Sequence, residues 1–143
     1  MKVIVCTMAK NENKYINEWC KHYISIGFDQ IYLYDNNDSQ DPYIGNFIED
    51  NLKDKITIID WRDRKERSML SKAYLDCYRK QEFDWAFFCD ADEFLVGIPN
   101  VSEFFEQNKE KFKNIEQIRI MWDWFGDDEM LERDESVPVM EAF

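Results

Sequence analysis

The segment Asp84-Trp85-Ala86-Phe87-Phe88-Cys89-Asp90-Ala91-Asp92-Glu93-Phe94 joins an apolar run to a group of acids. The apolar part is typical of a buried β-strand. In an extended chain, side chains at i and i+2 point to the same side, about 6 to 7 Å apart. Asp90 and Asp92 would then form a pair of like charges, which favours a bound cation or a retained proton. The alternative interpretation is a solvated loop whose acids precede a helix.

Further strands are predicted along the whole chain. Short apolar runs rich in β-branched and aromatic residues indicate five strands, at 3–6, 30–34, 55–59, 85–89 and 117–121.

Between these runs, apolar residues recur at helical spacing. Four apolar stripes carry this signal: Ile16, Trp19, Cys20 and Tyr23; Ile44, Phe47, Ile48 and Leu52; Met69, Leu70, Ala73, Tyr74, Cys77 and Tyr78; Phe104, Phe105 and Phe112. Gly27 is expected to end the first helix, Asp41-Pro42 to begin the second, and Ser102 to cap the fourth. The third is predicted over 66–81. His22 lies off the first stripe and is interpreted as a surface residue, with a catalytic role as the alternative.

Alternating strands and helices predict an α/β protein: a Rossmann-like three-layer sandwich with a mostly parallel sheet and helices on both faces. Residues 1–143 are expected to form one domain, because the length is typical of one domain and the sequence has no linker-like stretch.

Acids collect where the predicted strands end. Asp35, Asp60 and Asp90 end the second, third and fourth strands, and Asn11 and Glu12 follow the first. Ligands of such sheets bind at the carboxyl ends of the strands. We therefore expect these side chains to share one edge of the sheet, although acids as helix caps would explain part of the pattern.

Composition restricts the classes of partner. The chain carries 18 basic and 30 acidic residues, a net charge of −12, which argues against nucleic acid or an anionic membrane as the main partner. No stretch approaches the 18 or so apolar residues of a membrane span. The four cysteines form no Cys-x-x-Cys pair, so we expect buried free thiols in the cytoplasm, with disulfides as the alternative. Peripheral contact with the inner face of a membrane stays open.

The motifs exclude some chemistry. Only four glycines occur, and none forms a Gly-x-Gly-x-x-Gly or Walker-type loop that could hold phosphates. Carboxylate oxygens at Asp90 and Asp92 would suit Mg²⁺ or Mn²⁺. Because His22 is the only histidine and lies inside a predicted helix, Ser-His-Asp catalysis is not expected.

The order of the motifs resembles a known group of enzymes. Lys10-Asn11-Glu12, Tyr34-Asp35-Asn36, the Trp85–Phe94 stretch and Met121-Trp122-Asp123-Trp124-Phe125-Gly126 occur in this order. They are similar to glycosyltransferases of the family-2-like and family-92-like groups, over residues 3–126. The resemblance implies the glycosyltransferase type A fold and a function in polysaccharide biosynthesis.

The resemblance also implies roles for individual residues. Asp90 and Asp92 would be an Asp-x-Asp motif that binds Mn²⁺ or Mg²⁺ on the diphosphate of a nucleotide sugar, expected to be UDP-linked. Three further groups follow: Asn11, Glu12, Asp35 and Asp60 for the nucleotide; Arg67 and Lys72 for the nucleotide or its phosphates, or else as a solvated helix face; Trp122 and Asp123 for the donor sugar or the acceptor. The acceptor would be a glycan or a lipid-linked sugar.

Some roles stay unassigned. Domains of this type continue through an acceptor-binding part, so the domain is expected to be truncated at the C-terminus. No general base is identified, and Asp127 and Asp128 are the only candidates. Two alternatives remain: a non-catalytic nucleotide-binding half of a split transferase, and a haloacid-dehalogenase-type phosphatase. The second alternative normally has its Asp-x-Asp after the first strand, whereas here the pair follows the fourth.

Overall fold

Four parallel strands form the centre of the computed structural model, which describes residues 1–123 and 136–142. They are β1 (Val3–Ala9), β2 (Gln30–Asp35), β3 (Ile56–Asp60) and β4 (Trp85–Phe88). Their order in the sheet is β3-β2-β1-β4, and every neighbouring pair is parallel. The predicted parallel sheet is therefore confirmed.

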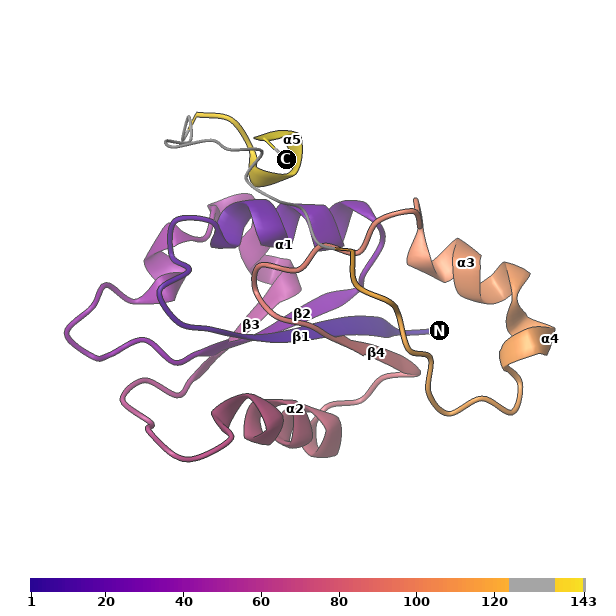
Figure 1. Ribbon diagram of the computed structural model, residues 1–143, viewed down its shortest axis with the longest axis horizontal. Helices are drawn as coiled ribbons and strands as arrows, with labels where there is room; N and C mark the ends of the chain where they lie inside the picture. Colours follow the sequence, from indigo (N-terminus) through magenta and orange to yellow (C-terminus); the bar gives the residue numbers. More distant parts are fainter. Residues whose placement is uncertain (124–135, 143) are drawn as a thin grey trace.

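Helices cover both faces of this sheet (Figure 1). On one face, Val3 and Val5 of β1 pack with the buried side of α1 (Ile16–Ser25). On the other face, Ile4 and Cys6 pack with Ala73 and Cys77 of α2 (Met69–Lys80). Alternate residues of one strand thus enter two separate cores, as a strand buried on both sides requires. The three-layer α/β prediction is confirmed.

The first helix has the predicted buried stripe. Ile16, Trp19, Cys20 and Tyr23 are fully buried. The helix ends before Gly27, whose φ of +92° favours glycine. A Cβ at this position would lie 2.9 Å from Nδ2 of Asn100, so that side chain would have to shift.

The segment after β2 differs from the prediction of an α-helix. It forms two short 3₁₀ turns, η1 (Ile44–Phe47) and η2 (Asp50–Lys55). Asn17 takes local backbone groups that an α-helix would use: its Nδ2 donates to the Phe47 carbonyl, and its Oδ1 accepts from the Glu49 amide at 3.0 Å. Three of the four predicted apolar positions are buried, and Phe47 is exposed.

Two predicted boundaries are corrected. The third predicted helix begins three residues late, at Met69, because Ser68 adopts a left-handed conformation with φ of 60° and ψ of 42°. The helix α3 (Val101–Gln107) is capped by Asn100 and not by Ser102, since Asn100 Oδ1 accepts from the Glu103 amide at 3.0 Å.

The fifth strand is absent among the described residues. Residues 117–121 form no strand, and Ile118, Ile120 and Met121 are exposed. They follow the short helix α4 (Lys109–Phe112). Within the described ranges β4 pairs only with β1. It is therefore an outermost strand of the sheet, and its four residues are half-buried.

The C-terminal helix contacts the first helix, the cysteines are free, and no described helix is suited to spanning a membrane. The amides of Val139 and Met140, at the start of α5 (Val139–Ala142), donate to the carboxylate of Glu18 on α1. All four cysteines are buried and free, as predicted. No helix in the described parts of the chain has the length and apolar character needed to cross a membrane.

Candidate functional site

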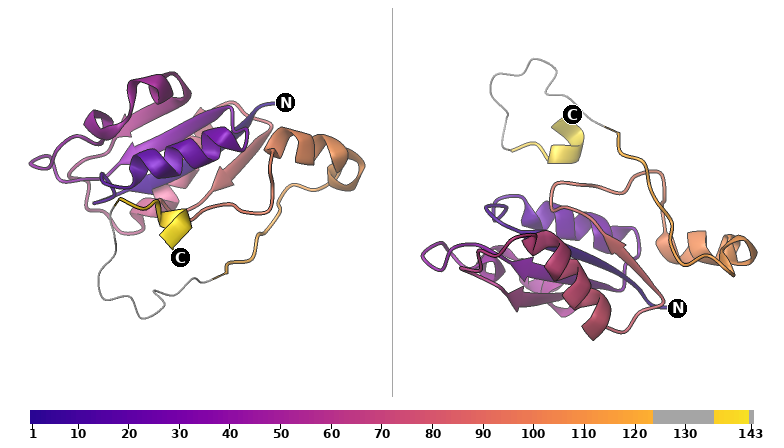
Figure 2. Two further views of the ribbon diagram at one scale, coloured as in Figure 1. Left: turned by 90° about the horizontal axis from the view of Figure 1, so that it is seen from above. Right: turned by 60° about the horizontal axis from the view of Figure 1, so that its bottom comes forward.

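The carboxyl ends of the strands meet at one edge of the sheet, the end opposite α3 and α4 in Figures 1 and 2. Ala9 is in register with Asp35, and Asp35 with Asp60. Phe88, the last residue of β4, is in register with Cys6. The loops that contain Asn11, Glu12 and the Asp90–Glu93 acids therefore leave the sheet at the same edge, as the sequence predicted.

The Asp-Ala-Asp-Glu segment is a turn, and this corrects the extended geometry expected for it. The amide of Glu93 donates to the Asp90 carbonyl at 3.1 Å, and the amide of Asp90 donates to the Glu93 carboxylate at 2.9 Å. Asp90 and Asp92 are both exposed. Glu93 thus closes the turn, and the two aspartates remain accessible at its surface.

Side chains of helix α1 hydrogen-bond to the backbone at the end of this turn. Trp19 Nε1 and the Tyr23 hydroxyl each donate to the Glu93 carbonyl at 3.0 Å. The Tyr23 hydroxyl also accepts from the Leu95 amide at 3.1 Å. One ring nitrogen of His22, Nε2, lies 2.8 Å from the Leu95 carbonyl. Three side chains of one helix therefore fix the backbone directly after the acids.

Sequence reasoning missed these anchors. His22 was expected at the surface, but it is half-buried, and its ring makes edge contacts with Tyr23 and Phe94. Burial lowers the pKa of His22, although the bond to Leu95 opposes this effect. A signal was present in the sequence: buried Trp and Tyr carry polar atoms that need partners. Trp19 and Tyr23 find those partners in the turn.

The loop after β1 approaches the same turn. The pKa of Glu12 is raised, first by burial and second by the negative charge of Asp92. On the other side, the Tyr74 hydroxyl of α2 donates to Asp90 Oδ1 at 3.2 Å. The charges of Glu12 and Asp92 therefore influence each other, while Asp90, in the same turn as Asp92, is bound by Tyr74.

Asp35 occupies a different environment from the exposed aspartates. Its side chain is fully buried. One oxygen accepts from the Asn37 amide at 3.0 Å and the other from the Ile44 amide at 3.3 Å. This carboxylate holds the loop after β2 in place and has no exposed surface to offer a ligand.

Asp60, which is in register with Asp35, forms an ion pair with Arg62. Nε and Nη2 of Arg62 donate to its two oxygens at 3.2 and 2.8 Å. These hydrogen bonds lower the pKa of Asp60. Its carboxylate is therefore an ionised partner of Arg62 at the exposed end of β3.

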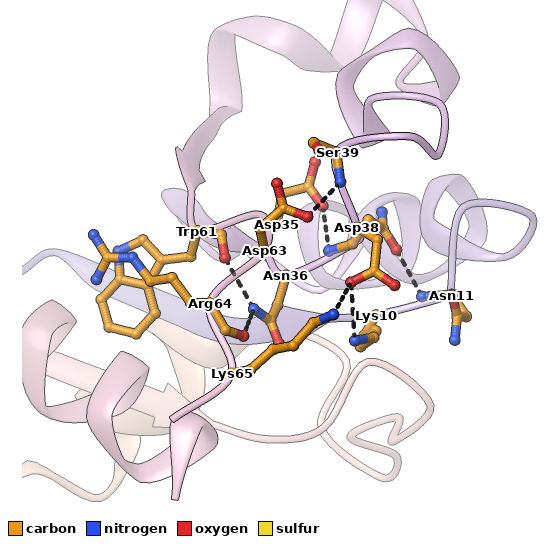
Figure 3. Close-up of polar contacts among 11 residues, drawn as sticks. Lys10, Asn11, Asp35, Asn36, Asp38, Ser39, Trp61, Asp63, Arg64 and Lys65 are labelled. Carbon is orange, nitrogen blue, oxygen red and sulfur yellow. Dashed lines mark hydrogen bonds and ion pairs between the residues drawn. The ribbon is translucent and has the colours of Figure 1, made fainter. Parts of the chain in front are cut away.

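Polar side chains tie the loops of this edge together (Figure 3). Nζ of Lys10 and Nζ of Lys65 each lie 3.6 Å from Oδ1 of Asp38. Asn36 Nδ2 donates to the carbonyls of Trp61 at 2.9 Å and Arg64 at 3.1 Å. Lys10 and Lys65 come from the loops after β1 and β3, so this otherwise acidic edge also carries cations.

The predicted basic residues behave differently from each other. Lys72 forms an ion pair with Glu66 and faces a shallow groove on α2 that also contains Arg79. Arg67 is exposed, and no partner for it is found in the described ranges. Of these two candidates, Arg67 is therefore the one whose charged group has no ion pair in the described ranges.

The remaining candidates are only partly placed. Trp122 and Asp123 are exposed on the segment that follows residues 117–121. Asp127 and Asp128 lie outside the described residues, so their candidacy as general base stays a prediction.

The side chains at this edge can be compared with the ligands that a divalent metal ion requires. Within the described ranges, no group of three or more His, Cys, Asp or Glu side chains is arranged to hold a metal. Two exposed carboxylates, Asp90 and Asp92, do fit the usual Mg²⁺ arrangement, in which one or two carboxylates bind the ion and phosphate and water oxygens complete the shell.

Comparison with known proteins identifies the family. The sequence profile of glycosyltransferase family 92 matches residues 1–139. The chain belongs to this family. A glycosyltransferase family 92 protein of Ricinus communis is 25% identical over 130 residues, which cover 87% of this chain and 23% of that protein. One from Arabidopsis thaliana is 24% identical over 128 residues, covering 88% of this chain and 22% of that protein.

A third relative, from Oryza sativa subsp. japonica, is 29% identical over 93 residues, 64% of this chain and 15% of its own length. The family 92 chain described here thus spans less than a quarter of the length of these curated relatives. No solved structure matches it. Its all-parallel sheet is consistent with the type A fold, and the family assignment replaces the phosphatase alternative.

Proposed function

We propose that this family 92 chain is the nucleotide-sugar-binding part of a metal-dependent glycosyltransferase. The enzyme would transfer a sugar from a UDP-linked donor to a glycan or lipid-linked acceptor in the cytoplasm. The observation that carries the proposal is the Asp90–Glu93 turn: it is anchored by Trp19 and Tyr23, and it presents Asp90 and Asp92 at the edge where parallel sheets bind ligands.

In this proposal, different residues bind the metal ion, support the turn and contact the phosphates. Asp90 and Asp92 hold Mn²⁺ or Mg²⁺, which would stabilise the charge that develops on the departing diphosphate. Glu93 and α1 keep the turn in one conformation, so that little reorganisation is needed when the donor binds. Arg67 and Lys10, both exposed near this edge, are the candidates for direct contacts with the phosphates.

Asp35 and Asp60 take an indirect part in this proposal. The bonds of Asp35 to Asn37 and Ile44 support it as a positioning residue for the nucleotide loops. Asp60 orients Arg62, whose guanidinium lies over the Tyr43 ring at 5.2 Å. Asn11 and Glu12, which leave β1 at the same edge, remain the candidates for direct contact with the nucleoside.

A thermal-shift panel tests this proposal. UDP, GDP, CDP and TDP are added to the chain with and without Mn²⁺, and the melting temperature is recorded. UDP with Mn²⁺ should raise the melting temperature most, because the ligand binds only the folded state. If no nucleoside diphosphate raises it in the presence of Mn²⁺, the proposed donor site is wrong.

One observation favours a second candidate function, nucleotide binding without transfer by this chain alone. Within the described ranges β4 has one neighbour, and its residues Trp85 to Phe88 are only half-buried. An open apolar strand edge is a common site of pairing with another chain. Release of free sugar or UDP from a UDP-sugar would contradict this candidate, whereas binding without any turnover would support it.

A further inference from the structure

A shallow groove of about 360 Å³ runs along the outer side of α2 and is called the α2 groove below. Trp61 and Leu75 are its apolar residues. Its charged residues are four cations and two acids: Arg64, Lys72, Arg79 and Lys80, with Glu66 and Asp76. The lining thus has an excess of two positive charges, on a chain whose net charge is −12.

The α2 groove lies on the side of α2 away from the acidic turn. Trp61 and Arg64 bring the segment after β3 to its wall. By contrast, Tyr74 of α2 binds Asp90, and its ring packs against Phe88 of β4 with 5.2 Å between centroids. Since β3 and β4 are the outermost strands of the described sheet, the groove and the turn flank α2 on opposite sides.

The groove is also separate from the candidate nucleotide residues. The Trp61 ring packs edge-on against Tyr34 in the core beneath α2, with 4.9 Å between centroids. In Figure 3 the Trp61 ring and the Arg64 guanidinium point away from Lys10 and Asn11. The α2 groove is therefore a feature outside the candidate donor site.

Both acids of the groove are already paired with cations. Glu66 forms an ion pair with Lys72. The Asp76 carboxylate lies 2.7 Å from Lys80 Nζ and accepts a hydrogen bond from the Tyr34 hydroxyl at 2.9 Å. These pairs neutralise two of the four cations, so the excess charge belongs to the other two.

The two remaining cations are arginines. Cζ of Arg64 lies 4.4 Å from the centre of the Trp61 ring, a cation–π contact that holds the guanidinium at the groove (Figure 3). Arg79 is exposed on the last turn of α2. Neither arginine forms an ion pair within the described ranges. A guanidinium has five N–H donors, so both groups can still bind an anion.

Two guanidinium groups without an acid favour one class of ligand. A guanidinium donates two parallel hydrogen bonds to a carboxylate or a phosphate. A carboxylate has a single charge and two oxygens, which one guanidinium satisfies. A phosphate monoester carries a charge of about −1.5 to −2 at pH 7 and three terminal oxygens, enough for two. We propose that the α2 groove binds a phosphate monoester group through Arg64 and Arg79.

Other ligands fit this groove less well. A neutral sugar would leave the excess positive charge uncompensated, and a metal cation would be repelled by it. The phosphate group can come from a soluble phosphate monoester or from the headgroup of phosphatidic acid in a bilayer. The proposal goes beyond the transferase function and does not rest on it.

Titration of the full chain with glycerol 3-phosphate at low salt, without nucleotide or metal, tests this proposal. Amide NMR shifts should change in a saturable way at Leu75 and Arg79. Arg79→Gln and Arg64→Gln should each weaken the affinity about tenfold or more, because charge-assisted hydrogen bonds are lost. Acetate, the carboxylate probe, should bind more weakly than glycerol 3-phosphate.

Two matched controls show where the ligand binds. Arg119→Gln removes an equal charge from an exposed residue that does not line the groove. Arg67→Gln removes a cation proposed for the donor phosphates. Neither should change the affinity for glycerol 3-phosphate. Equal weakening by Arg119→Gln, a loss with Arg67→Gln alone, acetate binding as tight as that of glycerol 3-phosphate, or the absence of a saturable shift would each overturn the proposal.

Vesicles distinguish the two sources of the phosphate group. The chain is sedimented with phosphatidylcholine vesicles that contain or lack phosphatidic acid. Sedimentation that requires both phosphatidic acid and Arg79 identifies the lipid headgroup, whereas glycerol 3-phosphate binding without sedimentation identifies a soluble monoester. The two proposals of this article fail separately: UDP–Mn²⁺ binding without glycerol 3-phosphate binding overturns only this one. Glycerol 3-phosphate binding without any nucleotide binding overturns only the proposed donor site.

Discussion

The hydroxyl of Tyr23, buried in α1, donates a hydrogen bond to the Glu93 carbonyl 3.0 Å away. This bond connects the core of the domain with the turn that carries Asp90 and Asp92. The same hydroxyl accepts from the Leu95 amide and from Cys89 Sγ, so one atom holds the chain on both sides of the turn. The geometry of the candidate site is therefore set from inside the fold.

Tyr23→Phe should lower the free energy of unfolding by about 1–3 kcal/mol, because buried backbone groups of Glu93 and Leu95 lose a partner. It should also reduce the melting-temperature increase given by UDP with Mn²⁺. Urea unfolding and thermal shift measure the two effects.

Tyr32→Phe is the matched control for this change. Tyr32 is buried too, at 7% exposure, and no hydrogen bond of its hydroxyl is found in the described ranges. It should leave the ligand-induced shift unchanged. An equal loss of that shift in both variants would show that Tyr23 has no special connection with the site.

The buried carboxylate of Asp35 gives a second prediction. Asp35→Asn should destabilise the fold by about 2 kcal/mol, because the amide group offers only one acceptor to the Asn37 and Ile44 amides. Urea unfolding measures this cost, with the exposed Asp54→Asn as the control. A stability within 0.5 kcal/mol (roughly the effect of a surface substitution) would contradict the structural role given to Asp35.

The raised pKa of Glu12 makes stability depend on pH. The folded state binds the Glu12 proton more tightly than the unfolded state does, so this group favours folding below its unfolded pKa of 4.5. That contribution is lost as the pH rises through the folded pKa. Glu12→Gln should therefore be relatively more stable than the wild type at pH 7 than at pH 4.

The charge of Asp92 contributes to this shift, so Asp92→Asn should bring the pKa of Glu12 closer to its ordinary value. NMR titration of the Glu12 carboxyl in metal-free protein measures the change. An unchanged pKa would place Asp92 too far from Glu12 for their charges to influence each other.

Much of this fold could be predicted from apolar periodicity. The four strands, the stripe of α1 and the shared edge of Asp35 and Asp60 follow from local sequence, because burial on both sheet faces imposes continuous apolar runs. Residues 117–121 have the same local signal and form no strand, since pairing depends on a neighbour that a local pattern does not contain.

The site was harder to predict than the fold. That Asp90 and Asp92 lie on a turn depends on the Glu93 side chain reaching back to the Asp90 amide. That Asp35 is buried depends on amides from the following loop. Both facts arise from side-chain to backbone bonds, which residue types alone do not specify. His22 shows the same limit, since its partner Leu95 is 73 positions away.

The binding of UDP with Mn²⁺ to Asp92→Asn tests the central claim most directly. No hydrogen bond of the Asp92 side chain is found within the described ranges, so the change removes a charge without breaking a contact of the fold. Titration calorimetry should show affinity at least about tenfold weaker than that of the wild type, while Asp54→Asn binds as the wild type does. Equal affinity in all three proteins would contradict the assignment of Asp92 as a metal ligand at the donor site.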